Sequence, residues 1–370
     1  MATGATRKDP DIMSFCSMIQ DDKARDKFCR DHGLLPQEPA PLPPRTSRAG
    51  GHNVSSQVWG ICGVLGFNPQ PKDPRPTFRC GACQKELSQE NGAAVIGNPN
   101  AKPSFFASRD KCDRPNVKLS RAEILWVMYC MIQGFSGAAT ARLAHEHYKL
   151  RSEALVHWRS RIRKVAAEEL KLRPRMGGPG EVVQVDETVY RGRRRANKGR
   201  QLTGDSVDRE GVRGPWVVGI VWMSTRECRL FKVKKRDSAT LGRLIQQNVL
   251  PGTTVWTDRW AAYLCVPLLS DGAGPMRLTH QTVNHEENFV DPVTGANTQM
   301  IEQQWRQNKR FVHEGGCRSS TLRSWLRWFS WESLNGHYRC MDPFMRIVGA
   351  IARQFPQSPF LGLPKCSMAE

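Results

Sequence analysis

Three acidic residues lie where short apolar segments of the chain begin or end. Asp186 lies within EVVQVDETVY (181–190), whose β-branched residues predict a buried strand. Asp258 ends TTVWTD (253–258), a second strand-like run, and Glu302 lies near the start of a predicted helix with one polar face. A charged side chain on a buried strand needs a partner, and carboxylates that meet in one cleft repel each other unless a divalent cation neutralises them. We therefore predict that these three acids bind metal.

The chemistry of such a trio follows from its oxygen ligands. Carboxylates select Mg²⁺ or Mn²⁺. Two such ions, about 3.5–4 Å apart, activate a water or a 3′-hydroxyl and stabilise the leaving oxygen of an in-line displacement. Asp186, Asp258 and Glu302 are thus predicted both as ligands of two ions and as the catalytic residues for a DNA phosphodiester.

Two other acids compete for a place in this site. Glu187 adjoins Asp186, and neighbouring strand residues face opposite sides, so at most one of the pair is expected to face the metals. Val182 and Val183 make both sides of the strand apolar, so the pattern leaves the choice open. Asp291 precedes a proline and is more simply explained as a turn residue.

The elements that must position these acids alternate along the second half of the chain. In order, the predicted elements are strands at 181–190, 216–223 and 228–234, a helix from Ser238 that stops at Pro251 and Gly252, strands at 253–258 and 277–283, and a helix from near Thr298. This order predicts an α/β fold with a ribonuclease H-like mixed sheet, which contains an antiparallel hairpin and carries helices on its faces. Sites in open mixed sheets gather near strand ends, where the acids fall.

The charge of the chain indicates a polyanionic partner. Lys and Arg total 55 against 35 Asp and Glu, a net charge of +20, and we expect the partner to be double-stranded DNA. RGRRRANKGR (191–200) holds six basic residues and no acid, and Arg193, Arg194 and Arg195 are predicted to contact phosphates. The alternative is a solvated loop that serves as a nuclear localisation signal.

Residues 119–172 predict three helices. Ser120 with Glu123 forms a capping box before the first, and a short turn separates the second from the third. This pattern is typical of a helix-turn-helix unit, with the third helix as the recognition helix. Its predicted DNA contacts are His157, Arg159, Arg161, Arg163 and Lys164. A plain three-helix bundle with a solvated basic face is the alternative.

Two paired steps in the first hundred residues have the spacing of zinc ligands. Cys80 and Cys83 form a C-x-x-C step, and Cys29 and His32 form a C-x-x-H step. Thiolate and imidazole ligands suit a structural, tetrahedral Zn²⁺. Cys62 and Cys112 are rival ligands, and ordinary free cysteines are the alternative to any zinc site.

The composition indicates the cellular compartment and the division of the chain into domains. Twelve cysteines without a regular framework indicate a reducing compartment, and neither a signal peptide nor a membrane-crossing apolar run of about 20 residues is evident. We expect a nuclear location in a eukaryote and a cytoplasmic one otherwise, with no membrane partner. The predicted parts are a tail or short helix (1–28), a zinc-ribbon-like segment with a Pro-rich insertion (29–118), the helix-turn-helix unit (119–172), the catalytic core (181–316) and C-terminal helices with a tail (317–370).

The motifs of the core carry a family resemblance. VDETVYRGRRRANKGR, VVGIVWMSTRECRLFKV, VLPGTTVWTDRWAAY, TVNHEENFVDPVTGANTQMIEQQW and WLRWFSWE are similar to the Merlin superfamily of cut-and-paste DDE transposases and its bacterial insertion-sequence relatives. The resemblance covers most of 181–345 and implies that the acidic trio is Asp186, Asp258 and Glu302. It also implies a zinc ribbon before the core, but His32 stands where a cysteine is usual and a long insertion occupies 33–79.

The resulting hypothesis is a DNA transposase that binds terminal inverted repeats and target DNA, acts as a homo-oligomer, and cuts and joins DNA with two Mg²⁺ or Mn²⁺ ions. Two alternatives stay open. One is a domesticated protein that binds DNA without cutting it, and the other is a nuclease of the ribonuclease H-like group.

Overall fold

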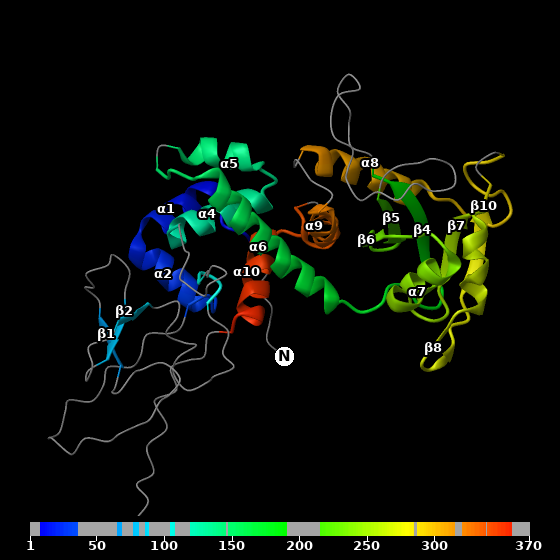
Figure 1. Ribbon diagram of the computed structural model, residues 1–370, viewed down its shortest axis with the longest axis horizontal. Helices are drawn as coiled ribbons and strands as arrows, with labels where there is room; N and C mark the ends of the chain where they lie inside the picture. The colour runs from blue at the N-terminus through cyan, green and yellow to red at the C-terminus, as the bar shows by residue number, and fades with distance from the viewer. Residues whose placement is uncertain are drawn as a thin grey trace, which may run out of the picture. The chain divides into compact units, whose positions relative to one another are not determined.

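The computed structural model (Figure 1) describes two compact units. The described residues are 8–35, 104–107, 119–145, 147–190, 215–284, 287–314, 320–337 and 339–356, together with the strands β1 (Leu65–Asn68), β2 (Thr77–Cys80) and β3 (Glu86–Ser88). Unit 1 comprises residues 1–158 and 342–370, and unit 2 comprises residues 159–341. None of the helices in the described ranges combines the length and the apolar character that a bilayer crossing requires.

Unit 1 is helical and is built around one buried helix. Its helices are α1 (Ile12–Gln20), α2 (Asp22–Asp31), α4 (Arg121–Ile132), α5 (Gly137–Ala144), the start of α6 (Ser152–Lys171) and α10 (Pro343–Gln354). The Ser120–Glu123 capping box predicted for α4 is present. Nearly every side chain of α4 is buried, and its Tyr129 ring stacks on Phe15 of α1 with 4.2 Å between ring centroids.

The N-terminal segment was expected to be a tail or a short helix, and it contains two helices. Residues 12–31 form two helices, each begun by an aspartate whose side chain accepts backbone N–H groups of the first turn. Phe15 and Ile19 pack into the unit, and Asp26 accepts both Nε–H and Nη2–H of the buried Arg121. Phe15 and Ile19 are buried in α1 whereas Ile12 and Met13 are exposed, so the apolar residues did not mark one clear helical face.

Unit 2 contains a five-stranded mixed sheet. Its strands are β4 (Val182–Val189), β5 (Trp216–Trp222), β6 (Cys228–Val233), β7 (Thr254–Asp258) and β10 (Thr279–Val283), in the spatial order β10-β7-β4-β5-β6. β4, β5 and β6 are antiparallel neighbours, whereas β4, β7 and β10 run parallel. This is the ribonuclease H-like arrangement, so the predicted fold class is confirmed. A 3-10 helix η1 (Ala261–Leu268) and a small hairpin of β8 (Ser270–Asp271) and β9 (Gly274–Pro275) were not predicted.

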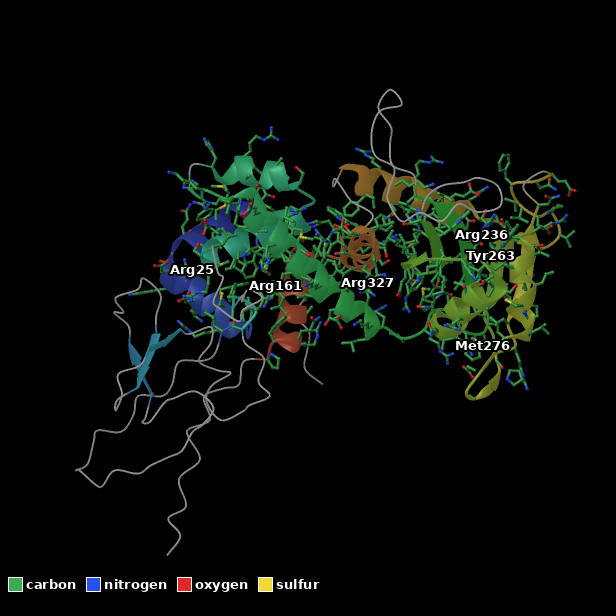
Figure 2. The ribbon with its side chains drawn as sticks, viewed as in Figure 1. Arg25, Arg161, Arg236, Tyr263, Met276 and Arg327 are labelled. Carbon is green, nitrogen blue, oxygen red and sulfur yellow. The ribbon has the colours of Figure 1, made fainter. Side chains whose placement is uncertain are left out.

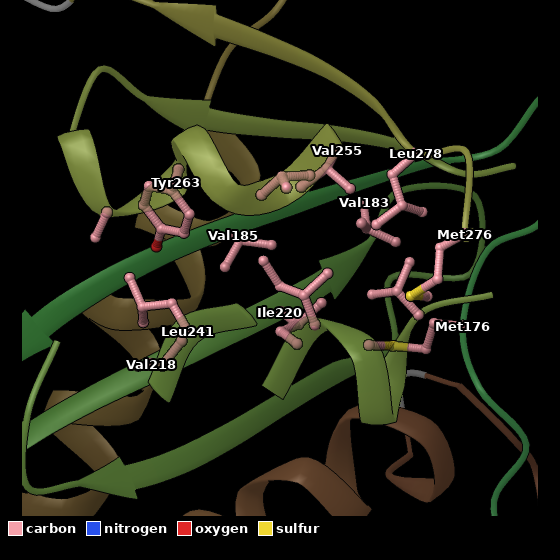
Figure 3. Close-up of a cluster of buried hydrophobic side chains, with 14 residues drawn as sticks. Met176, Val183, Val185, Val218, Ile220, Leu241, Val255, Tyr263, Met276 and Leu278 are labelled. Carbon is pink, nitrogen blue, oxygen red and sulfur yellow. The ribbon is translucent and has the colours of Figure 1, made fainter. Parts of the chain in front are cut away.

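Helices cover both faces of the sheet, α7 (Ser238–Asn248) on one and α8 (Gln299–Glu314) and α9 (Leu322–Asn335) on the other (Figure 1). Val183 and Val185 of β4 point toward α7 and η1, in the cluster drawn in Figure 3, where Tyr263 lies at one end and Met276 near the other. Val217 and Val221 of β5 point toward α8 and α9. The alternation of strand side chains produces these two separate cores.

The two predicted C-terminal helices belong to different units. α9 packs on β6, an edge strand, and the hydroxyls of Ser330 and Ser333 accept the backbone N–H groups of Leu230 and Cys228, each at 3.1 Å. These bonds satisfy backbone groups that an edge strand otherwise leaves open. α10 instead packs in unit 1, where Phe344 contacts the ring of Phe15. The single C-terminal segment expected from the sequence is therefore divided.

Candidate active site

The parallel pairing of β4 with β7 brings two aspartates level with each other. Val182 pairs with Thr254, and Gln184 pairs with Trp256. Two residues further along each strand come Asp186 and Asp258, whose side chains repeat the direction of Gln184 and Trp256 because strand periodicity is two. Equal spacing from a shared register thus places the two acids side by side on adjacent strands, with Asp186 inside β4 and Asp258 at the end of β7.

α8 is docked on β4 through a matched set of hydrogen bonds. Gln184 Oε1 accepts the N–H of Ile301 at 3.0 Å, Asp186 Oδ2 accepts Nε1–H of Trp305 at 2.7 Å, and Thr188 Oγ1 accepts from Lys309 Nζ at 2.6 Å. Successive helix partners are four residues apart, a rise of about 6 Å, while successive strand partners are two apart, about 6.6 Å. Because these two rises are nearly equal, α8 can form a hydrogen bond with every second residue of β4.

Gly219 lets α8 approach the sheet closely enough for this contact. It pairs directly with Asp186 across β4 and β5, and its open side faces α8. A Cβ at this position would lie 2.6 Å from Ile301 Cδ1 and 2.6 Å from the Trp305 ring. The missing side chain therefore makes room for the tryptophan that bonds to Asp186.

Three carboxylates converge at this end of the sheet. Asp186, Glu187 and Asp258 each offer an oxygen, and these oxygens all lie within 4.8 Å of one another. Oxygens of both Asp186 and Glu187 therefore lie close enough to approach one ion, although the two side chains leave opposite faces of β4. Pairing of β4 with β7 ends at Gln184 and Trp256, so beyond that point Glu187 lies beside an open strand edge rather than within a continuous layer.

Glu302 lies apart from this group. It is exposed in the first turn of α8, and its Oε1 accepts the hydroxyl of Thr298 at 2.8 Å. Its charge nevertheless contributes to raising the pKa of Asp186. Of the predicted trio, Asp186 and Asp258 are thus brought together with Glu187, and Glu302 lies near them on α8. Asp291 has the turn role expected, because its side chain accepts the N–H groups of Val293 and Thr294.

Two of the converging carboxylates have raised pKa values. Burial, with smaller contributions from the charges of Asp258 and Glu302, raises the pKa of Asp186 to about 6 against the lowering effect of the hydrogen bond from Trp305. Burial, followed by the charge of Asp186, raises the pKa of Glu187 to about 8, while Tyr263 and Arg236 oppose the shift. Partly buried acids that repel one another are stabilised by protons or by a cation, and their hard oxygen donors fit Mg²⁺ or Mn²⁺.

Arg236 is held against two tryptophan rings near the carboxylates. The Arg236 guanidinium lies 4.3 Å from the ring centroid of Trp216 and 4.1 Å from that of Trp260. Trp260 donates its backbone N–H to Asp258 Oδ1 at 3.0 Å and its indole N–H to the carbonyl of Arg236 at 3.3 Å. Arg236 and Tyr263 are both labelled in Figure 2. The clamp therefore fixes Asp258 and holds a positive charge near Glu187.

Sequence reasoning missed these supporting residues. Trp305, Trp260 and Arg236 follow Glu302, Asp258 and the strand β6 within three residues, yet nothing in the pattern distinguishes them from core tryptophans or surface arginines. The high number of tryptophans in the chain, eleven, was the sequence signal that could have pointed to these residues.

The basic residues of α6 that were predicted to contact DNA do not share one face of the helix. His157 and Lys164 are exposed seven residues apart, but Arg163 is 5% exposed, its guanidinium 4.5 Å from the Trp325 centroid and its Nε–H bonded to Ser324 Oγ. Arg159, four residues before Arg163, acts on the carboxylate of Glu332 in α9. Residues spaced by two alternate around a helix, so the listed basic residues are divided between solvent and α9.

Arg163 is thus a packing residue and not a DNA contact. Arg161 is half-buried, and burial lowers the pKa of its guanidinium. Arg193, Arg194 and Arg195 lie outside the described residues.

The predicted zinc ligands are only partly described. Cys29 is buried in α2, where burial raises the pKa of its thiol to about 12, and the His32 ring lies 4.5 Å from that of Phe28. A zinc ligand must be a thiolate, so this environment favours packing for Cys29. Cys80 is the last residue of β2, but its side chain and Cys83 lie outside the described residues, as do Cys62 and Cys112.

The chain is similar to several known proteins. Among solved structures, the chain is similar to the HTLV-2 integrase catalytic core domain in complex with magnesium in its dimeric form, at 14% identity, 42% of this chain, 87% of that chain and a TM-score of 0.26. The trimeric form of the same domain matches at 15% identity, 44% and 88% coverage and a TM-score of 0.26. The catalytic core domain of BIV integrase matches at 14% identity, 47% and 97% coverage and a TM-score of 0.26.

No curated protein matches the chain. Residues 178–318, which contain the sheet, the three converging carboxylates and α8, match the family model described as ISXO2-like transposase domain.

Proposed function

We propose that this chain is a DNA transposase of the DDE type, which cleaves phosphodiesters with divalent metal and joins the released ends to new DNA. One observation carries the proposal: Asp186 and Asp258 lie level on adjacent parallel strands, and α8 holds Glu302 near them. The match of 178–318 to a transposase domain supports it. The finer assignment to the Merlin superfamily is part of the same proposal.

Within this proposal, Asp186 and Asp258 hold the metal, and Glu302 or Glu187 completes the ligand set. The bound ions, when present, supply an activated oxygen nucleophile and stabilise the leaving oxygen. Trp305 and Trp260 orient the aspartates, because each donates an N–H to one carboxylate oxygen. Orientation matters since reacting groups misplaced by about 1 Å lose much of the rate.

The DNA partner follows from charge. A net charge of +20 favours a polyanion, and Arg193, Arg194, Arg195, Arg161, His157 and Lys164 are the proposed contacts to terminal inverted repeats and target DNA. A zinc site at Cys80 and Cys83 and assembly into an oligomer on DNA stay part of the proposal.

The test uses duplexes carrying the sequence that flanks the gene, with Mn²⁺ and the full chain. Nicking at the element end, followed by strand-transfer products from paired ends, is the expected result. Specific binding without cleavage would favour the domesticated DNA-binding alternative. Cleavage without end specificity and without joined products would favour the ribonuclease H-like nuclease.

A further inference from the structure

Gln184 is a polar side chain buried between β4 and α8. It is 0% exposed and lies two residues before Asp186, on the face of β4 that carries α8. A buried side-chain amide needs partners for its oxygen and for its nitrogen, because leaving either without a hydrogen bond is costly. The partners of Gln184 therefore show which part of the molecule this side chain holds in place.

Both ends of the Gln184 amide bond to the start of α8. Its Oε1 accepts the backbone N–H of Ile301 at 3.0 Å, and its Nε2 donates to Asn297 Oδ1 at 3.0 Å. Asn297 Oδ1 also accepts the backbone N–H of Gln299 at 3.3 Å. Backbone N–H groups in the first turn of a helix have no partner within the helix. Gln184 and Asn297 together therefore cap α8, and one of the two caps comes from the sheet.

Glu302 depends on this cap because it lies in the first turn of α8. Helix ends fray, so an acid in a first turn is positioned only as firmly as that turn. Asp186 and Asp258, in contrast, lie on hydrogen-bonded strands. Thr298 is 1% exposed and donates its hydroxyl to Glu302 Oε1 at 2.8 Å. The Glu302 carboxylate is therefore held by a buried group of the capped turn.

We propose that Gln184 is a positioning residue, which fixes the first turn of α8 on β4 so that Glu302 can join Asp186 and Asp258 on a divalent cation. The inference rests on the proposed function. The charge of Glu302 contributes to raising the pKa of Asp186, so the two carboxylates lie within electrostatic reach of each other. A ligand that is ordered before the ion arrives loses less conformational freedom on binding. Residues that orient a metal ligand without touching the metal contribute about 10- to 100-fold in metal affinity.

The experiment compares Gln184→Met with Gln246→Met as a matched control. Methionine has nearly the length of glutamine but lacks the amide. Gln246 lies in α7, on the other face of the sheet, where its side-chain amide donates to the carbonyl of Ser270. Asn297→Ala is a second and milder variant, because Asn297 is only half-buried and the bond between Gln184 and Ile301 stays in place. It decides the question if Gln184→Met does not fold.

The first measurement is hydrogen exchange of the full chain without metal. The backbone amide of Ile301 is expected to exchange about tenfold faster in Gln184→Met than in the parent, because its acceptor is lost and the first turn of α8 opens more often. In Asn297→Ala the same increase is expected at the amide of Gln299. Gln246→Met should exchange as the parent does at both amides. Unchanged exchange in Gln184→Met and in Asn297→Ala would overturn the inference.

The second measurement is the Mn²⁺ affinity of the DNA-free chain, obtained from the paramagnetic resonance signal of unbound Mn²⁺. Gln184→Met and Glu302→Gln are each expected to weaken binding about tenfold, and Gln246→Met is expected to bind as the parent does. The double variant should bind no more weakly than Glu302→Gln alone, because Gln184 acts through Glu302. Losses that add in the double variant, or parent affinity in both Gln184→Met and Asn297→Ala, would contradict the positioning role.

Nicking of end duplexes separates this inference from the proposed function. If the losses fail to add but the parent chain never cuts DNA with Mn²⁺, the proposed function fails and the positioning role of Gln184 stands. If Glu302→Gln binds Mn²⁺ as the parent does, the positioning role fails. The proposed function would then continue with Glu187 as the third ligand.

Discussion

Asp186 and Glu187 are neighbours in β4, but they lie on opposite faces of the strand and make different interactions. On the face toward α8, Asp186 is oriented by a hydrogen bond from Trp305 within a ladder of helix-to-strand bonds. On the face toward η1, Glu187 lies against the buried ring of Tyr263, at the end of an apolar cluster, and its charge contributes to keeping the tyrosine pKa well above the usual value. Asp186 is held by directional bonds and Glu187 by burial, and the pKa of Glu187 is raised further than that of Asp186.

The largest expected effect comes from Asp186→Asn. The amide keeps the shape and an oxygen for the Trp305 bond but loses the charge, so cleavage should fall by several orders of magnitude while DNA binding is retained. Mn²⁺-dependent nicking beside a binding assay on one preparation measures this. Asp237→Asn is the control, because asparagine caps α7 as well as aspartate does and no loss is expected. Nicking at the parent rate would remove Asp186 from the site.

The next prediction decides which acid completes the site. Glu302→Gln should fold normally and bind DNA, because exposed helix positions usually change stability by less than about 0.5 kcal/mol, while its cleavage falls by orders of magnitude. Glu187→Gln should affect cleavage less, since its face of β4 is the apolar one. Nicking rates over a Mn²⁺ titration distinguish the two. If Glu302→Gln cleaves as the parent does and Glu187→Gln does not, Glu187 is the third ligand.

A pH dependence of intermediate size tests the charge states. The folded-state pKa values of Asp186 and Glu187 are raised from 3.8 to about 6 and from 4.5 to about 8, so the stability they contribute is present below about pH 4 and is lost as pH rises through 6 and 8. Without metal, the free energy of unfolding should therefore fall over this window by an amount on the order of a few kcal/mol.

Urea unfolding at several pH values measures that loss, and Glu187→Gln should flatten the upper part of the curve. Mg²⁺ should restore stability at pH 8, because a ligand that binds only the folded state adds to its stability. A parent curve that matches Glu187→Gln between pH 6 and 8.5 would contradict the assignment of a raised pKa to Glu187.

The smallest expected effect concerns the close approach of α8. Gly219→Ala places a methyl against Ile301 and the Trp305 ring, so α8 must shift, at a cost of roughly 1–3 kcal/mol. The shift should also weaken the Trp305 bond to Asp186 and slow cleavage. Gly272→Ala is the matched control, since a Cβ there meets nothing within 4 Å. Equal unfolding midpoints for the two variants would show that the α8 face adapts without cost.

Local sequence pattern specified some features of unit 2, whereas tertiary contacts specified others. The strand and helix order of unit 2 was readable because β-branched runs and the Pro251–Gly252 pair mark where elements separate, although α7 is capped by Asp237 and ends at Asn248. The placement of Asp186 within one strand and of Asp258 at the end of another was readable for the same reason. The distribution of the α6 arginines was not readable from charge alone, because the helical period from His157 to Lys164 divides these side chains between solvent and α9.

The sequence alone determined the mixed-sheet fold, the positive charge and the placement of Asp186 and Asp258 on its strands, because these depend on local pattern and composition. Only the tertiary structure decided that Glu187 joins Asp186 and Asp258, that Trp305 and the Arg236–Trp260 pair orient the aspartates, and that α9 and α10 belong to different units. Those outcomes depend on the register of β4 with β7 and on the depth to which α8 packs over Gly219. Both are set by contacts between residues more than 30 positions apart, which no local pattern specifies.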